Sequence, residues 1–179
     1  RPATIRAVST GPSSSAIADV NRDGKPDFVA AYYDGSLSLF GNTTVFDRAG
    51  YFGAATNVTV GDAPRSVAIG DLNRDGKLDL VVANQGGDVS VLLNNGAGAF
   101  GAPTNYAAGN QPFSVAIGDL DGDGIADLVV ANFSGNDVSV LYGTGSGAFG
   151  APTNFAVGTS TNPHAVAIGD LNGDGKADL

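Results

Sequence analysis

Short apolar segments, many rich in β-branched residues and bounded by glycine, recur along the whole chain. Ser66-Val-Ala-Ile-Gly70 and Leu80-Val-Val-Ala-Asn84 are typical, and segments of this length and composition predict β-strands. Several are almost continuously apolar, as expected for strands that are buried on both faces. No segment has the periodicity of an amphipathic helix, so the sequence predicts an all-β protein.

The predicted strands fall into groups of four. The best-defined group covers 66–71, 79–84, 88–94 and 101–108. The group after it covers 114–119, 127–132, 137–143 and 150–157, and the group before it covers 15–19, 27–33, 36–41 and 53–60, with an insertion at 42–52. Four strands in a repeat of roughly fifty residues are typical of the blades of a β-propeller.

We therefore predict a β-propeller built of four-stranded antiparallel blades. The chain divides into the outer strand of a preceding blade (1–10), blade 1 (11–61), blade 2 (62–109), blade 3 (110–158) and the start of blade 4 (159–179). About three complete blades and a partial one are fewer than the roughly four to eight of a closed ring. Because exposed strand edges pair with other chains, we expect further propeller blades, or a homo-oligomer through strand edges, to complete the ring.

One aspartate-rich nonapeptide occurs four times, each time between the first and second predicted strands of a group. The copies are Asp19-Val-Asn-Arg-Asp-Gly-Lys-Pro-Asp27, Asp71-Leu-Asn-Arg-Asp-Gly-Lys-Leu-Asp79, Asp119-Leu-Asp-Gly-Asp-Gly-Ile-Ala-Asp127 and Asp170-Leu-Asn-Gly-Asp-Gly-Lys-Ala-Asp178. Oxygen-bearing side chains at the first, third, fifth and ninth positions, with glycine at the sixth, suit Ca²⁺, which takes oxygen ligands from a tightly turned loop. Because the side chain at the seventh position varies, we expect its backbone carbonyl to face the ion.

Two other interpretations of the nonapeptide explain less. An EF-hand begins in the same way but requires a bidentate Glu at position twelve and flanking helices. Position twelve is Ala30, Val82 or Val130 in the first three copies, and the flanks are predicted strands. A turn rich in Asp and Asn without metal explains one copy, but not four copies with the same ligand positions. The pattern therefore predicts calcium loops.

Charge supports this interpretation and excludes several partners. The formal net charge is −9, and all 18 acidic residues are Asp. Thirteen of them lie at ligand positions, so four Ca²⁺ ions would change the net charge to −1. Nucleic acids and anionic membranes attract clustered Lys and Arg, whereas the nine basic residues here are scattered. No segment approaches the roughly 18 apolar residues of a membrane span, and the absence of cysteine excludes disulfides.

Together with Leu80-Val-Val-Ala-Asn84, Ala99-Phe-Gly-Ala-Pro103 and Ala148-Phe-Gly-Ala-Pro152, the nonapeptide resembles the FG-GAP or VCBS repeat family, which is similar to the propeller of integrin α subunits. The resemblance covers essentially the whole chain. It implies a propeller with calcium in the hairpin loops between first and second strands, usually secreted or on a cell surface. The implied ligands are the side chains of Asp19, Asn21, Asp23, Asp27, Asp71, Asn73, Asp75, Asp79, Asp119, Asp121, Asp123, Asp127, Asp170, Asn172, Asp174 and Asp178, with the backbone carbonyls of Lys25, Lys77, Ile125 and Lys176.

The chain departs from the family pattern at two places. In the first copy Ala18 precedes the loop where the others have glycine, and Phe52-Gly53 lacks the following proline. The fourth loop is followed only by Leu179. We therefore expect a less regular first blade and a less complete fourth calcium site.

For function, we expect a non-catalytic, extracellular or cell-surface module for binding or adhesion that recognises protein or glycan, with calcium as a structural element. The alternatives are the propeller portion of a secreted polysaccharide- or lipid-acting enzyme and a self-assembling surface or fibre component.

Titratable residues outside the loops that could serve catalysis are few, and their positions favour turns or the surface: Asp34, Asp47, Asp62, Asp88, Asp137 and His164. Tyr and Phe in these strands are typical of blade core. Glycan attachment is open at Asn42, Asn57 and Asn132, each followed by x-Ser/Thr.

Overall fold

The computed structural model describes residues 11–42 and 52–179. The strand predicted within 1–10 and nearly all of the insertion at 42–52 lie outside these residues. Within the described ranges, no helix is long and apolar enough to cross a membrane.

Three four-stranded antiparallel sheets make up the fold, and each follows the chain as a simple meander. The first contains β1 (Pro12–Ala18), β2 (Asp27–Tyr32), β3 (Ser36–Phe40) and β4 (Thr56–Thr59). The second contains β5 (Pro64–Gly70), β6 (Asp79–Asn84), β7 (Asp88–Leu92) and β10 (Thr104–Ala107), with the small hairpin β8 (Asn94–Gly96) and β9 (Ala99–Phe100) inserted before β10. The third contains β11 (Pro112–Gly118), β12 (Asp127–Asn132), β13 (Asp137–Leu141) and β14 (Thr153–Ala156).

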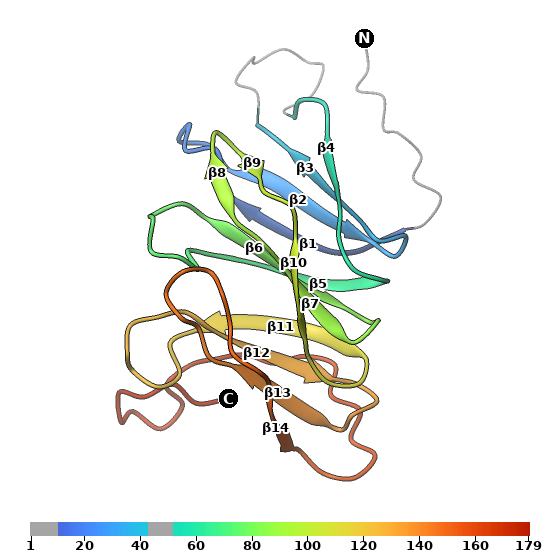
Figure 1. Ribbon diagram of the computed structural model, residues 1–179, viewed down its shortest axis with the longest axis vertical. Helices are drawn as coiled ribbons and strands as arrows, with labels where there is room; N and C mark the ends of the chain where they lie inside the picture. The colour runs from blue at the N-terminus through green and yellow to red at the C-terminus, as the bar shows by residue number, and fades with distance from the viewer. Residues whose placement is uncertain (1–10, 43–51) are drawn as a thin grey trace.

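The sheets stack face to face in chain order, as Figure 1 shows from the blue first sheet to the yellow and orange third. One apolar cluster joins the first sheet to the second, and another joins the second to the third. The middle strand β6 serves both, because Leu80 and Val82 pack toward the first sheet while Val81 and Ala83 pack toward the third. Alternate side chains of a strand point to opposite faces, so double burial explains why β6 is apolar throughout.

Close packing of the second blade on the third, and of the third on the segment that follows it, depends on the glycine that ends β5 and β11; β1 ends at Ala18 instead. Ile117 Cδ1 lies 3.1 Å from the point that a Cβ on Gly70 would occupy, and Ile168 Cδ1 lies 3.0 Å from the same point at Gly118. A side chain larger than glycine would push the next blade away. The equivalent position on Gly169 has no heavy atom within 4 Å.

The predicted all-β architecture of four-stranded antiparallel blades is confirmed, and these blades do not close into a ring within this chain. Strand ends differ from prediction where proline is involved. The first strands β1, β5 and β11 begin at Pro12, Pro64 and Pro112, two or three residues before their predicted starts. Proline is tolerated there because the first residue of a strand need not donate a hydrogen bond to the neighbouring strand. The outer strands β10 and β14 begin only after Pro103 and Pro152.

One expectation about a single segment was wrong. The predicted first strand of blade 4 is not formed, because residues 163–168 pair with no strand among the described residues and only the bridge between Gly169 and Asp178 closes this hairpin. In the first blade, β1 to β4 pair in the same order as the strands of the other blades.

Asn132, where the sequence left glycan attachment open, cannot carry a glycan in this fold. It is the last residue of β12 and is fully buried. Its Nδ2 donates to Asp137 Oδ1 and Ser139 Oγ, both at 2.7 Å, and Ser139 Oγ donates in turn to Asn154. Asn84 makes the same two contacts in the second blade. Buried polar groups of this kind are tolerated because they hydrogen-bond to one another.

We predict that Asn132→Ala lowers the free energy of unfolding by about 1 to 3 kcal/mol, because the carboxylate of Asp137 and the hydroxyl of Ser139 lose their buried donor. Urea unfolding measures the change. The exposed Asn95 provides the matched control, and Asn95→Ala should change stability by less than about 0.5 kcal/mol. Equal effects of the two substitutions would contradict a structural role for the buried asparagine.

Candidate metal centres

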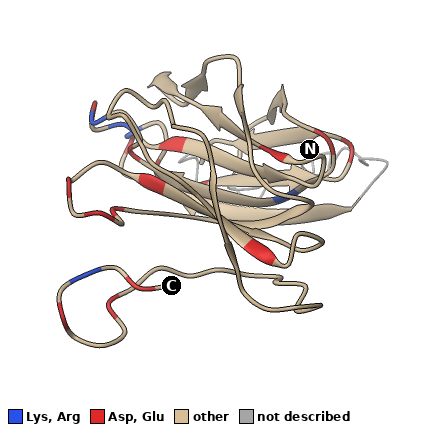
Figure 2. Ribbon diagram, turned by 60° about the horizontal axis from the view of Figure 1, so that its bottom comes forward, with Lys and Arg blue, Asp and Glu red and all other residues tan. Residues whose placement is uncertain are grey.

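The nonapeptide loops lie where the sequence places them, between the first and second strands of each blade. In the first three copies the ninth-position aspartate is the first residue of the second strand, namely Asp27 of β2, Asp79 of β6 and Asp127 of β12. Figure 2 shows Asp residues concentrated in loops and at strand ends. The four loops therefore occupy equivalent places in successive blades.

Within each loop, side-chain oxygens fold back onto the loop's own backbone amides. The amide of the sixth-position glycine donates to the first-position carboxylate at 2.8 Å in all four copies. Third-position oxygens accept from the fifth-position amide, and fifth-position oxygens accept from the seventh, at 2.7 to 3.1 Å. The sixth position requires glycine, because its φ lies between 75° and 83°. These turns give the four loops the same backbone shape, and in the third loop they bring three carboxylates together.

The ninth-position aspartate has a second role that sequence reasoning did not find. In the second blade, Asp79 Oδ2 accepts from the Leu72 amide at 2.9 Å, and Oδ1 accepts from the Asn94 amide at 2.8 Å. The carboxylate therefore ties the loop to the segment that follows the third strand. Asp27 and Asp127 make equivalent pairs of bonds. All three of these aspartates are buried, and burial is the signal that would have revealed this role. The residue types in the motif do not indicate which of its aspartates is buried.

The pKa values of two loop carboxylates are shifted in opposite directions. Desolvation raises the pKa of Asp79, and the amides of Asn94 and Leu72 oppose this effect. At the exposed first position of the fourth loop, hydrogen bonds from backbone amides, that of Gly175 foremost, lower the pKa of Asp170. A neighbouring cation stabilises the ionised form of every such group.

Three observations show that the loop residues fit a hard divalent cation. Asp119, Asp121 and Asp127 each offer an oxygen within 4.8 Å of the others, and ligands at about 2.4 Å on opposite sides of Ca²⁺ are about that far apart. Asp71 Oδ1 is buried and has no hydrogen-bond partner, as expected for an oxygen whose partner is a cation rather than a hydrogen-bond donor. The side chains at the four ligand positions all carry oxygen, and a carboxylate oxygen that accepts one hydrogen bond keeps a second lone pair.

The lysines at the seventh position also interact through their side chains, although the variation at this position suggested that only its backbone carbonyl matters. Lys77 Nζ lies 2.6 Å from Asp75 Oδ2, and Lys25 Nζ lies 3.5 Å from Asp23 Oδ2. The hydrogen bond from Lys77 lowers the pKa of Asp75. The ammonium group therefore neutralises part of the carboxylate charge in the first two loops.

The fourth loop contains the same turn bonds as the others, and Leu171 N donates to Asp178 Oδ2 at 3.0 Å. Among the described residues, no second backbone amide donates to the Asp178 carboxylate in the way that the Asn94 amide donates to Asp79. The fourth loop thus differs from the others in the hydrogen bonds of its ninth-position carboxylate.

A family model described as an FG-GAP-like repeat matches residues 19–82, 71–130 and 119–179. Each match contains two successive nonapeptide loops. The chain belongs to the FG-GAP-like repeat family. No curated protein sequence matches it significantly.

Solved structures share the fold of this FG-GAP-like chain. An Agrocybe aegerita lectin, described as recognising non-reducing terminal N-acetylglucosamine, is 26% identical with a TM-score of 0.57, over 90% of this chain and 44% of the lectin. The Tc holotoxin pore of Photorhabdus luminescens is 26% identical with a TM-score of 0.53, over 91% of this chain and 8% of its own. BBS1N in complex with ARL6DN, at 15% identity and a TM-score of 0.58 over 91% of this chain and 48% of its own, shows the fold alone. The chain spans less than half of each of these proteins.

Arginine at the fourth position connects successive FG-GAP-like loops. Arg74 donates from Nε to Gly124 O at 3.1 Å and from Nη2 to Asp123 O at 3.2 Å, both in the next loop. Its φ of 61° is unfavourable for a residue with a side chain, and the third and fourth loops have glycine there, Gly122 and Gly173. The contact with the next loop offsets the backbone strain in the second loop.

The titratable residues outside the loops mostly serve turns. Asp88 and Asp137 accept from buried asparagines, and Asp34 accepts from the amide and hydroxyl of Ser36. His164 is exposed, as expected. Asp47 lies outside the described residues.

We predict that Arg74→Ala destabilises the chain by about 1 kcal/mol, because two hydrogen bonds from a charged donor are lost at an exposed site while a Cβ remains at positive φ. Arg74→Gly should be less harmful, since glycine relieves about 1 kcal/mol of strain at the same position. Urea unfolding compares the two variants. A glycine variant that is as unstable as the alanine variant would contradict the balance between strain and contact.

Proposed function

We propose that this chain is a calcium-stabilised, non-catalytic binding module that works outside the cell or on its surface. The observation that carries the proposal is the repetition of one oxygen-lined turn in four loops. Each loop assembles three or four carboxylates, which repel one another unless a cation lies among them. The ligands would be the first-, third-, fifth- and ninth-position side chains with the seventh-position carbonyl, and the bound ion would supply the compensating charge.

The proposed location follows from the proposed ion. Extracellular calcium modules bind Ca²⁺ with dissociation constants of about 10⁻⁴ to 10⁻³ M, and we assign these exposed loops to that class. Such sites fill outside the cell, where free calcium is high.

Binding rather than catalysis is supported by the chemistry around the loops. Asp34, Asp88 and Asp137 are engaged in turn hydrogen bonds. Among the structural relatives at 26% identity is a lectin, and this favours a glycan over a protein as the recognised partner. A fold alone does not define a ligand, so the glycan remains part of the proposal.

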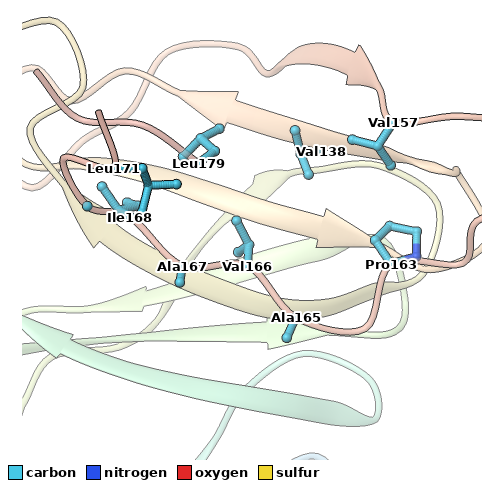
Figure 3. Close-up of a pocket in the computed structure, with 10 residues that line it drawn as sticks. Val138, Val157, Pro163, Ala165, Val166, Ala167, Ile168, Leu171 and Leu179 are labelled. Atoms are coloured by element: carbon cyan, nitrogen blue, oxygen red, sulfur yellow. The ribbon is translucent and has the colours of Figure 1, made fainter. Parts of the chain in front are cut away.

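A further blade is the proposed partner at the end of the third sheet. An apolar hollow of about 510 Å³ lies there. Figure 3 shows it between Val138 and Val157 on one side and Val166 and Ile168 on the other. Nearby, Leu171 is 76% exposed, although the equivalent Leu72 is buried. A blade of the same repeat, from a longer chain or a second copy, would cover these groups as each blade covers the preceding one.

The test compares the 179-residue chain in excess Ca²⁺ with the same chain after exhaustive chelation, by thermal melting and on a printed glycan array. Saturation at 100 times the dissociation constant stabilises by about 2.7 kcal/mol per site, so we predict that chelation lowers the melting temperature by many degrees and abolishes glycan binding. Magnesium at equal concentration is the control for charge screening. An unchanged melting curve after chelation would contradict the role of calcium, and a calcium-loaded chain that binds no glycan would contradict the proposed ligand.

A further inference from the structure

Two positions at the end opposite to the carboxylate loops carry different side chains in successive blades. The residue after the proline that precedes or opens the first-strand segment is Ser13, Arg65, Phe113 or His164, and the residue after the second strand is Tyr33, Gln85 or Phe133. A residue that a blade needs in order to fold would recur in each repeat. Side chains that differ from copy to copy are instead expected where they meet something outside the blade.

A β-bulge displays the first of these positions. The pairing registers of β5 with β6 and of β11 with β12 shift between Pro64 and Ser66 and between Pro112 and Ser114, respectively. Arg65 and Phe113 are therefore the unpaired residues of their strands. Bulges redirect a side chain out of the regular alternation and are common next to functional sites.

Arg65 and Phe113 join the residues that follow β2 and β12 and the histidine after Pro163 in one continuous row across all three sheets, the aromatic row: Tyr33, Arg65, Phe113, Phe133 and His164. The Arg65 guanidinium lies 4.6 Å from the ring centroids of both Tyr33 and Phe113. Phe113 and Phe133 stack at 4.9 Å, and His164 meets both edge-on, at 5.3 Å and 4.8 Å.

Hydrogen bonding fixes the cation within the row. Arg65 Nε donates to Gln85 Oε1 at 2.9 Å, and Nη2 contacts the same oxygen. No ion pair of Arg65 is found in the part of the chain that the structure describes. The row is therefore a series of planar side chains in contact, in which the charged guanidinium of Arg65 lies between the ring faces of Tyr33 and Phe113.

The row is accessible at both of its ends. Tyr33 is 41% exposed and His164 is exposed, whereas Arg65, Phe113 and Phe133 are half-buried. Tyr32, the residue before Tyr33, is instead buried in the blade. The position of Tyr33 in a predicted strand favoured a role in the blade core, but its side chain lies outside that core.

We propose that the aromatic row is a saccharide-binding surface, an inference that rests on the proposed function and places its ligand. A pyranose ring has an apolar C–H face and polar hydroxyls at its rim. Such a ligand matches exposed aromatic faces flanked by donors such as the Gln85 amide and the His164 imidazole. The net charge of −9 disfavours nucleic acid as the stacking ligand.

Substitutions at the two accessible ends test the surface. The probe is the glycan with the strongest signal for the calcium-loaded chain on the printed array, and titration measures its affinity. Tyr33→Ala and His164→Ala should each weaken binding about tenfold, while Tyr33→Phe, which keeps the ring, should bind within about twofold of the unaltered chain. Tyr142→Ala is the matched control, because Tyr142 is 43% exposed but follows β13 at the carboxylate-loop end.

A second readout does not depend on any substitution. His164 is the only histidine of the chain, so its imidazole C–H signals in proton NMR are unambiguous. Addition of the array-selected glycan should shift these signals in proportion to saturation. Unshifted His164 signals during saturating binding, or equal affinities of Tyr33→Ala, His164→Ala and Tyr142→Ala, would overturn the aromatic row alone. A chain that binds no glycan at all would overturn both the row and the proposed glycan function.

Discussion

Each blade depends on one aspartate whose two carboxylate oxygens accept hydrogen bonds from opposite directions. Asp79 holds the amide of Leu72 at the start of its loop and the amide of Asn94 beyond the third strand. Three segments distant in sequence are thereby fixed around one buried carboxylate. The turn bonds within the loop orient its other oxygens, and this last residue anchors the loop to the sheet, so the candidate metal centre and the blade form one unit.

Stacking of the blades follows from the same geometry. The first strand ends immediately before the loop, at Gly70 or Gly118, where the isoleucine of the next blade packs within about 3 Å of the missing Cβ. Arg74 adds a polar contact between consecutive loops a few residues later. Apolar packing between sheets and polar contacts between loops therefore reinforce one another along the stack. At the opposite end of the strands, the bulges at Arg65 and Phe113 bring side chains of neighbouring blades into contact.

The sequence predicts the repeated features well and the singular ones poorly. Strand positions, blade number and loop placement follow from short apolar segments and from four copies of one motif, because local periodicity determines them. The brace formed by Asp79 and the burial of Asn132 depend on which distant amides and hydroxyls lie nearby, and no local pattern encodes this. Arg65 shows the same limit: its neighbours Tyr33 and Phe113 belong to other blades, so only the stacked structure brings the row together.

The central claim is that the loops exist to hold calcium, and diffraction from crystals grown with Ca²⁺ tests it most directly. Anomalous scattering locates the ions independently of the protein atoms. The account predicts one ion in each of the first three loops, about 2.3 to 2.6 Å from six or seven oxygens and from no nitrogen or sulfur. Empty loops under these conditions, or four-coordinate sites with other ligands, would contradict it.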